Sequence, residues 1–172
     1  MRDIRSIKAA VFDLDGTLLD STAAWEGLGE RYLAGRGITP EPGLDEKLRC
    51  MTLTDGSAYL KSAYSLPEPP DEILRDILRG IEEFYLAECP LKPGAQELLG
   101  LLSRRGVGIS AATAGDERLA RAALERLGVL GYFSALLTCE GYGGKDKPDI
   151  FLNAAGAAGG IPDNTAGFED SL

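Results

Sequence analysis

The chain has 172 residues and a formal net charge of −9 at pH 7, with 44% hydrophobic and 26% charged residues. This composition is typical of a globular protein with one well-buried domain, or a core with a smaller insertion. The acidic balance argues against a nucleic-acid surface, and no apolar run approaches the ~18 residues of a membrane span. We therefore expect a cytoplasmic monomer or weak oligomer that acts on small metabolites without nucleic-acid or membrane partners.

The residue types that are missing narrow the chemistry. Histidine is absent, which excludes Ser-His-Asp and Cys-His catalysis and most transition-metal sites. Cys50, Cys89 and Cys139 are odd in number and widely spaced, so they indicate neither a zinc site nor a disulfide framework. Any catalysis must depend on carboxylates, hydroxyls and lysines.

The strongest signal lies near the N-terminus, in the string AAVFDLDGTLLDS. Residues 7–12 are apolar and are followed at once by turn residues, which predicts a short buried strand that ends at Asp13. Asp15 lies two residues on, on the same side of an extended chain, and Gly16 lets the backbone fold back beneath both carboxylates. Two carboxylates in one pocket repel unless a cation such as Mg²⁺ or a proton offsets their charge. A plain polar Asp-Gly turn is the alternative.

Residues 21–88 carry helical patterns and no strand signal. The patterns predict helices over 21–36, 44–51 and 57–64, the last capped by Asp55, and an amphipathic helix from Asp71 to about Tyr85. This change of pattern marks an inserted all-α domain over 21–88, within an α/β core formed by 1–20 and 89–172. The insertion is either a stabilising bundle or a lid that keeps water from a reactive site.

From residue 89 onward, strand and helix patterns alternate. Strands are predicted over 107–112, 133–138 and 165–168, with helices between them, and this alternation predicts a Rossmann-like parallel sheet with helices on its faces. Ligands of such sheets bind at the carboxyl ends of the strands. The polar residues that stand out fall at such ends: Asp13, Asp15, Thr113, Lys145, Glu169 and Asp170.

Four of these segments together resemble the motifs of the haloacid dehalogenase-like (HAD) hydrolases. They are DLDGT from Asp13, SAATAGD around Thr113, the K-x-x-P-D-I-F segment from Lys145, and GFEDS around Asp170. The insertion resembles the type 1 helical cap of this superfamily, and the sequence is most similar to β-phosphoglucomutase-like and phosphoglycolate phosphatase-like members.

The resemblance, together with the chemistry of the residues, assigns roles. Asp13 is expected to be the nucleophile that forms an aspartyl phosphate, and Asp15 the general acid and base. Thr113 and Lys145, with the amides of Leu14 and Ala114, are expected to bind the phosphate. In the family pattern, Mg²⁺ is held by the carboxylates of Asp13 and Asp170 and the backbone carbonyl of Asp15, with Glu169 assisting through water. Lys147 is a second candidate for the lysine.

These roles predict a Mg²⁺-dependent phosphatase of small phosphorylated metabolites. Asp15 favours phosphatases and phosphomutases over dehalogenases, because a halide leaving group needs no proton. A sugar-phosphate mutase is the alternative, and cap residues such as Trp25, Arg49 and Tyr59 would decide between the two.

A last expectation concerns the end of the chain. Family members continue after the fourth motif with a helix, a strand and a final helix, so the C-terminal part of the core is expected to be missing here. The sheet would then lose an edge strand, and Asp170 would lie beside a frayed end. Truncation, omitted residues or a partner chain are competing explanations, and a catalytically inert fragment is a further functional alternative.

Overall fold

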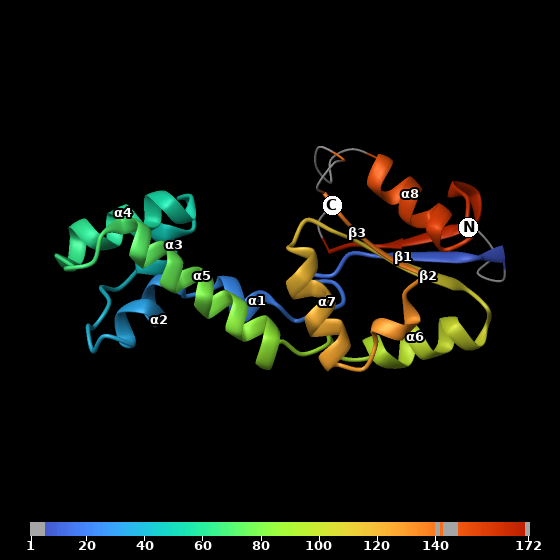
Figure 1. Cartoon of the computed structure of the whole chain (residues 1–172), viewed down its shortest axis with the longest axis horizontal. Helices are drawn as coiled ribbons and strands as arrows, with labels where there is room; N and C mark the ends of the chain where they lie inside the picture. The colour runs from blue at the N-terminus through green and yellow to red at the C-terminus, as the bar shows by residue number, and fades with distance from the viewer. Residues whose placement is uncertain (1–5, 140–141, 143–147, 171–172) are drawn as a thin grey trace. The chain divides into compact units, whose positions relative to one another are not determined.

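The computed structural model describes residues 6–139, 142 and 148–170. The chain forms two compact units. The first, here called the core unit, comprises Met1–Ser21 and Tyr85–Leu172, and the second, the helical unit, comprises Thr22–Phe84. Residues 85–88, which the sequence analysis placed in the insertion, therefore belong to the core unit. Figure 1 shows both units in a single colour ramp along the chain.

A parallel four-stranded sheet forms the centre of the core unit, in the order β3-β2-β1-β4. β1 lies between β2 and β4, and Phe12 pairs with Ala111 on one side and with Phe168 on the other. All four residues of β1 are buried, which explains why its sequence is a continuous apolar run. The parallel Rossmann-like sheet predicted from the alternating pattern is confirmed. The strands are β1 (Ala9–Phe12), β2 (Gly108–Thr113), β3 (Ala135–Thr138) and β4 (Thr165–Phe168).

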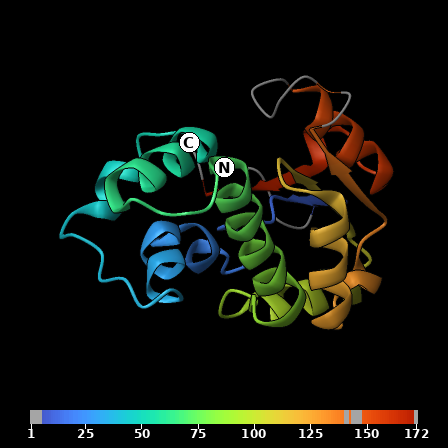
Figure 2. The ribbon, with the colours of Figure 1, turned by 60° about the vertical axis from the view of Figure 1, so that its left-hand side comes forward.

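Helices cover both faces of this sheet, as Figures 1 and 2 show, with α8 on one side and α6 and α7 on the other. Ile150 and Ala154 of α8 pack against Val11 and Ala112 of the central strands. Small residues in the sheet let the helix lie close, so the core depends on shape as much as on apolar area. The bounds are α6 (Ala95–Arg104), α7 (Glu117–Arg126), η2 (Leu130–Tyr132), α8 (Asp149–Ala157) and η3 (Pro162–Asn164).

The first half of the helical unit contains shorter helices than the pattern predicted, whereas α4 and α5 are longer than predicted. The single helix expected over 21–36 is wrong: the chain breaks at Gly27, which has φ +64°, and the Gly27 N–H donates to Asp45 Oδ1 at 2.8 Å. A left-handed residue cannot continue a right-handed helix, and glycine adopts that conformation without a side-chain penalty. The helices are α1 (Thr22–Trp25), α2 (Leu28–Ala34), α3 (Leu44–Leu48), α4 (Leu53–Tyr64) and α5 (Pro70–Ala87).

The start of α4 also differs from the prediction. Thr52, not Asp55, is the N-cap: its hydroxyl oxygen accepts the Asp55 N–H at 3.1 Å and donates to the Asp55 carboxylate at 2.7 Å. The reciprocal pair satisfies a backbone donor of the first turn and adds residues 53–56 to the helix. The sequence predicts an apolar stripe on α5 through Ile73, Ile77, Ile81 and either Phe84 or Tyr85. The three isoleucines are buried, and Tyr85 is the buried residue at the last position.

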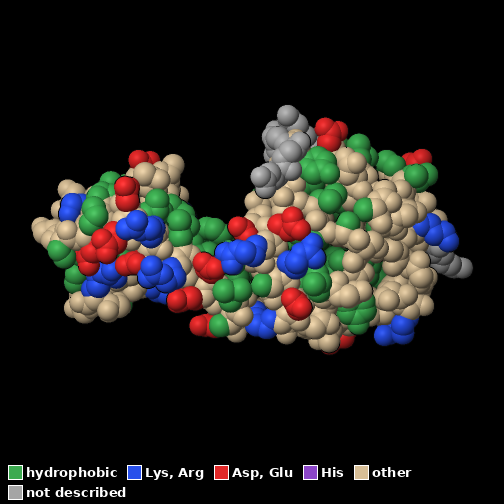
Figure 3. Space-filling model, in the orientation of Figure 1, with side chains coloured by type: hydrophobic (Ala, Val, Ile, Leu, Met, Phe, Trp, Pro, Cys, Tyr) green, Lys and Arg blue, Asp and Glu red, His purple; other side chains and the backbone are tan. Residues whose placement is uncertain are grey.

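The surface of the helical unit mixes both signs of charge, as the interspersed blue and red side chains of Figure 3 show. Arg36 is an example, because it pairs with Asp76 at 2.8 Å and lies over the ring of Tyr32. Exposed pairs of this kind contribute little each, so the apolar interior carries most of the stability. Among the described residues, every helix is too short or too polar to cross a bilayer.

The start of β2 gives a direct test of the core packing. A methyl group on Gly108 would overlap the backbone carbonyl of Ala158 at the end of α8, whereas one on Gly156, within α8, would meet open space. We expect Gly108→Ala to lower the free energy of unfolding by about 1–3 kcal/mol because the backbone has to move. Gly156→Ala should leave it unchanged or raise it by up to about 1 kcal/mol. Urea unfolding of both variants measures this, and equal stabilities would contradict the packing described here.

Candidate active site

The first functional residues follow β1 directly. Asp13 is only 3% exposed, and its backbone N–H donates to the Phe168 carbonyl at 2.9 Å, which continues the β1–β4 ladder by one residue. The Thr17 hydroxyl donates to Asp13 Oδ2 at 3.1 Å. Between these two residues the chain turns back on itself, with the N–H groups of Leu18 and Leu19 both donating to the Leu14 carbonyl. This turn fixes the Asp13 carboxylate at the carboxyl end of the sheet.

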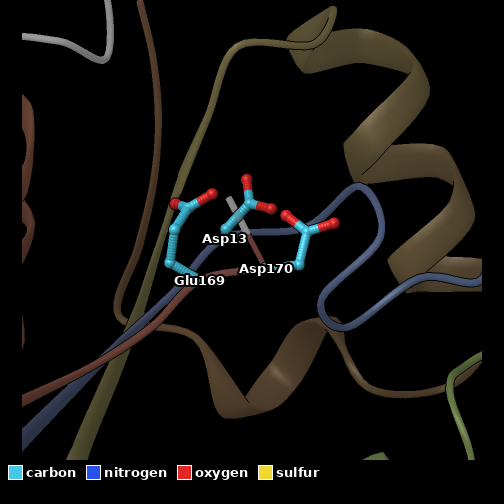
Figure 4. Close-up of side chains that lie close together, drawn as sticks. All are labelled: Asp13, Glu169 and Asp170. Carbon is cyan, nitrogen blue, oxygen red and sulfur yellow. The ribbon is translucent and has the colours of Figure 1, made fainter. Parts of the chain in front are cut away.

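Two further carboxylates lie beside Asp13, as Figure 4 shows. Glu169 and Asp170 follow β4, and each of the three side chains offers an oxygen within 4.8 Å of the other two. The parallel pairing of β1 with β4 is the cause, because it aligns Phe12 with Phe168 and so brings the residues that follow them together. The stacked rings of Phe12 and Phe168, 4.3 Å apart, hold the ends of the two strands in place.

Gly16 is required by this arrangement. It has φ +81°, a conformation that L side chains rarely adopt, and a methyl group at this position would overlap the carboxylate of Asp170. The glycine of the DLDGT string therefore does two things at once. It allows the turn after β1, and it leaves space for the acidic side chain of β4.

The donor set fits a hard divalent cation. Mg²⁺ binds oxygen ligands at about 2.0–2.1 Å in octahedral geometry, so two ligands of one ion lie about 3 Å apart when adjacent and about 4.2 Å apart when opposite. The three carboxylates, with oxygens within 4.8 Å of one another, are close to that range. Three carboxylates this close repel one another strongly without a cation. Asp13, Glu169 and Asp170 thus form a candidate magnesium site. A contribution from the Asp15 carbonyl stays a prediction.

The Asp15 side chain has partners outside this acidic cluster. Its Oδ1 accepts the Tyr85 hydroxyl at 2.5 Å, and its Oδ2 accepts the Thr113 hydroxyl at 3.5 Å. Asp13 and Asp15, two residues apart, thus face different environments: one faces carboxylates and the other faces hydroxyl groups. This difference suits a nucleophile and a proton donor respectively.

Thr113 ends β2 and is fully buried. Its hydroxyl oxygen also accepts the Gly115 N–H at 3.0 Å, which orients the side chain toward Asp15. Leu14 is buried and Ala114 is exposed, and the expected role of their amides in phosphate binding remains a prediction. Lys145 and the alternative Lys147 lie outside the described residues.

Cys89 and Arg126 border the site. Burial raises the pKa of the Cys89 thiol to about 11, the negative charge of Asp15 adds to the increase, and Arg126 opposes it. The Arg126 guanidinium donates to the carbonyls of Tyr85 and Cys89, at 3.3 and 2.5 Å. A buried neutral thiol of this kind is a packing group.

Trp25, Arg49 and Tyr59, the residues expected to decide between a phosphatase and a mutase, lie in two different environments of the helical unit. Trp25 and Arg49 line a mostly apolar cavity of about 450 Å³ within that unit. Arg49 also pairs with Asp45 at 2.7 Å, and this hydrogen bond holds the pKa of the Asp45 carboxyl below its usual value. Tyr59 is not among the residues that line the cavity: its hydroxyl donates to Glu41 at 2.7 Å and accepts from Lys47.

Sequence reasoning missed two partners of the candidate carboxylates Asp13 and Asp15. Thr17 belongs to the DLDGT string, and its position four residues after Asp13 on a tight turn is a weak indication that its hydroxyl could reach the Asp13 carboxylate. Tyr85 is 70 positions from Asp15, and its place on the apolar stripe of a helix predicted a core position only. A buried tyrosine generally needs a partner for its hydroxyl, and this was the one available signal.

Comparisons with known proteins agree with the geometry of this site. The sequence profile of the haloacid dehalogenase-like hydrolases matches residues 7–172. A phosphoglycolate phosphatase of Agrobacterium fabrum is 31% identical over 171 residues, which is 95% of this chain and 72% of that protein. A β-phosphoglucomutase of Mycobacterium bovis is 28% identical over 203 residues, with 96% of this chain and 74% of that protein covered.

A solved structure shows the same fold. It is a HAD-superfamily hydrolase of subfamily IA from Geobacter sulfurreducens, with a TM-score of 0.76 and 22% identity over 96% of this chain and 79% of that one. The chain therefore belongs to the haloacid dehalogenase-like hydrolases. The resemblance drawn from its four motifs is confirmed, and so is the expectation of an enzyme.

The buried thiol gives a prediction about reactivity. Because the pKa of Cys89 is raised to about 11, its thiolate fraction at pH 8 is roughly two hundredfold below that of an ordinary thiol with a pKa of ~8.5. Iodoacetamide at pH 8 should therefore alkylate the exposed Cys50 first and leave Cys89 intact in the folded protein. Peptide mass spectrometry over time measures both rates, with urea-unfolded protein as the control. Equal rates in the folded protein would contradict this environment.

Proposed function

We propose that this HAD-like phosphoric monoester hydrolase releases inorganic phosphate from small phosphorylated metabolites in a Mg²⁺-dependent reaction through an aspartyl phosphate on Asp13. The observation that carries the proposal is the placement of Asp13 beside two further carboxylates, with Asp15 turned to separate partners. The curated relatives named as a phosphoglycolate phosphatase and a hexitol phosphatase support a phosphorylated metabolite as the substrate. A screen of phosphorylated sugars and acids, read by phosphate release, tests the substrate class.

The proposed reaction has two displacements. In the first, an Asp13 oxygen attacks phosphorus while the bond from phosphorus to the leaving alcohol breaks, and the leaving oxygen takes a proton from Asp15. In the second, water attacks the aspartyl phosphate and gives its proton to Asp15, and the bond between phosphorus and Asp13 breaks. This route divides one difficult displacement into two easier ones and returns both side chains to their initial states.

Charge on the transferred phosphoryl group is to be balanced by fixed groups around it. Thr113 would donate a hydrogen bond from the end of β2, and Lys145 is the proposed cation. Asp13, Asp170 and Glu169 would hold the metal ion, which when bound supplies positive charge to the phosphate oxygens. The role of the protein residues is to place and orient the phosphate in line with Asp13.

We propose a cap function for the helical unit. Its cavity of about 450 Å³, lined mostly by apolar residues, supports this proposal because ligand pockets are commonly of this size and character. Exclusion of water would protect the aspartyl phosphate until the alcohol has left. We also propose that the enzyme acts in the cytoplasm as a monomer or weak oligomer.

A second candidate function is a sugar-phosphate mutase, and one observation favours it: a β-phosphoglucomutase is among the relatives that cover nearly the whole chain. A mutase would return the phosphoryl group from Asp13 to another hydroxyl of a sugar phosphate instead of passing it to water. Incubation with β-glucose 1-phosphate separates the two. Glucose 6-phosphate as the product supports the mutase, and free phosphate supports the phosphatase.

The nucleophile can be tested by Asp13→Asn with p-nitrophenyl phosphate as the probe. We expect kcat to fall about a thousandfold or more, because the amide oxygen cannot form the covalent intermediate. Asp20→Asn is the matched control: Asp20 follows the same turn but pairs with Lys92 at the surface, and its variant should keep wild-type turnover. Undiminished activity in Asp13→Asn would reject the mechanism, and a folded wild type without turnover at any Mg²⁺ concentration would support the inert alternative.

The metal site can be tested by Asp170→Asn. Loss of one carboxylate should raise the Mg²⁺ concentration for half-maximal activity by at least about tenfold, since even outer-shell partners contribute that much to affinity. Asp163→Asn, an exposed residue of η3, serves as the control. Titration of EDTA-treated enzyme with Mg²⁺ gives both values, and the same midpoint in Asp170→Asn and wild type would place the ion elsewhere.

A further inference from the structure

Tyr85 makes the shortest of the hydrogen bonds that the structure gives to the Asp15 side chain. It lies in the last turn of α5, is 5% exposed, and donates its hydroxyl to Asp15 Oδ1 at 2.5 Å. Both residues belong to the core unit. A hydroxyl that donates to a carboxylate at 2.5–2.7 Å makes a charge-assisted bond, about twice as strong as a neutral one.

The backbone around Tyr85 is held by the core unit. Arg126 of α7 donates to the carbonyls of Tyr85 and Cys89, and a cation at the end of α5 also complements the partial negative charge of a helix C-terminus. The segment that follows pairs with the turn after Asp15, since Lys92 N–H donates to Leu18 O at 2.9 Å. The donor and the acceptor are thus fixed by separate contacts of the same unit.

The two oxygens of Asp15 differ as a result. Oδ1 is occupied by Tyr85, whereas Oδ2 lies near the Thr113 hydroxyl at a long 3.5 Å. A methyl group built on Gly115 would lie 2.9 Å from Oδ2, so the absence of a side chain at Gly115 leaves room beside that oxygen. Oδ2 is therefore the oxygen with space for a reacting group.

We propose that Tyr85 is a positioning residue that orients Asp15 so that Oδ2 carries the catalytic proton. The proposal rests on the proposed function of Asp15 as general acid and base. The Tyr85 hydroxyl can donate to Oδ1 whether or not Oδ2 is protonated, because Oδ1 keeps a lone pair in both states. The contact thus persists while Oδ2 gives a proton to the leaving alcohol and takes one from water.

The test compares Tyr85→Phe with wild type on p-nitrophenyl phosphate and phenyl phosphate. The value of kcat/KM covers the steps up to departure of the phenol, and phenol needs a proton at that step far more than p-nitrophenol does. A hydrogen bond to a charged group contributes about 1.5–3 kcal/mol. We therefore expect kcat/KM for phenyl phosphate to fall about tenfold or more, with less than about a twofold change for p-nitrophenyl phosphate.

Two further variants make the result specific. Tyr132→Phe, in η2 of the same unit, removes a hydroxyl that lies beside Gly100 of α6, and it should change neither value. In an Asp15→Asn background, Tyr85→Phe should cause no further loss, since a residue that acts through Asp15 has no effect without it. Equal losses on both substrates, no loss on either, or an additive loss in the double variant would overturn the proposal.

A crystal structure of Tyr85→Phe separates failure of this inference from failure of the proposed function. We expect the Asp15 carboxylate to leave the orientation that directs Oδ2 toward Thr113, and an unchanged side chain would overturn the inference even in an inactive enzyme. By contrast, failure of the proposed function is read without any Tyr85 variant, as undiminished turnover in Asp13→Asn.

Discussion

The structure depends on one constraint: three carboxylates have to be held together against their mutual repulsion. The parallel pairing of β1 with β4 meets it, because the in-register Phe12 and Phe168 bring Asp13 next to Glu169 and Asp170. The stabilising energy comes from the buried strand β1 and from the stacked rings of Phe12 and Phe168, which directly precede the charged residues. An apolar core thus stabilises an acidic edge that would be unfavourable in isolation and is well suited to a divalent cation.

A second principle separates the roles of Asp13 and Asp15. They share one turn, yet Asp13 faces other carboxylates and Asp15 faces the hydroxyl groups of Tyr85 and Thr113. Identical side chains can acquire different chemistry from their surroundings, and the proposed mechanism uses this difference to assign Asp13 as nucleophile and Asp15 as proton donor. Gly16 makes this division possible, since only glycine allows the turn and leaves space for Asp170.

The insertion of the helical unit does not interrupt the sheet. The chain leaves the core unit after Ser21 and returns at Tyr85, and the crossing segments pair through an antiparallel bridge between Leu19 and Leu91. The hydrogen bond from the Asp20 N–H to Pro90 O, at 2.9 Å, continues this contact. The exit and the return of the chain are therefore held side by side directly after the turn that follows β1.

The sequence alone determined the parallel α/β core, the helical insertion and the residues at the strand ends, because apolar period and turn residues are local signals. It did not determine the break at Gly27 or the Thr52 cap, which depend on partners such as Asp45 and on competition between nearby caps. The motif resemblance already grouped Asp13, Glu169 and Asp170, but only the tertiary structure decided that the Asp15 side chain has partners outside this group and contacts Tyr85. These contacts join residues far apart in the chain, and their geometry follows from strand register and helix packing, which no local pattern encodes.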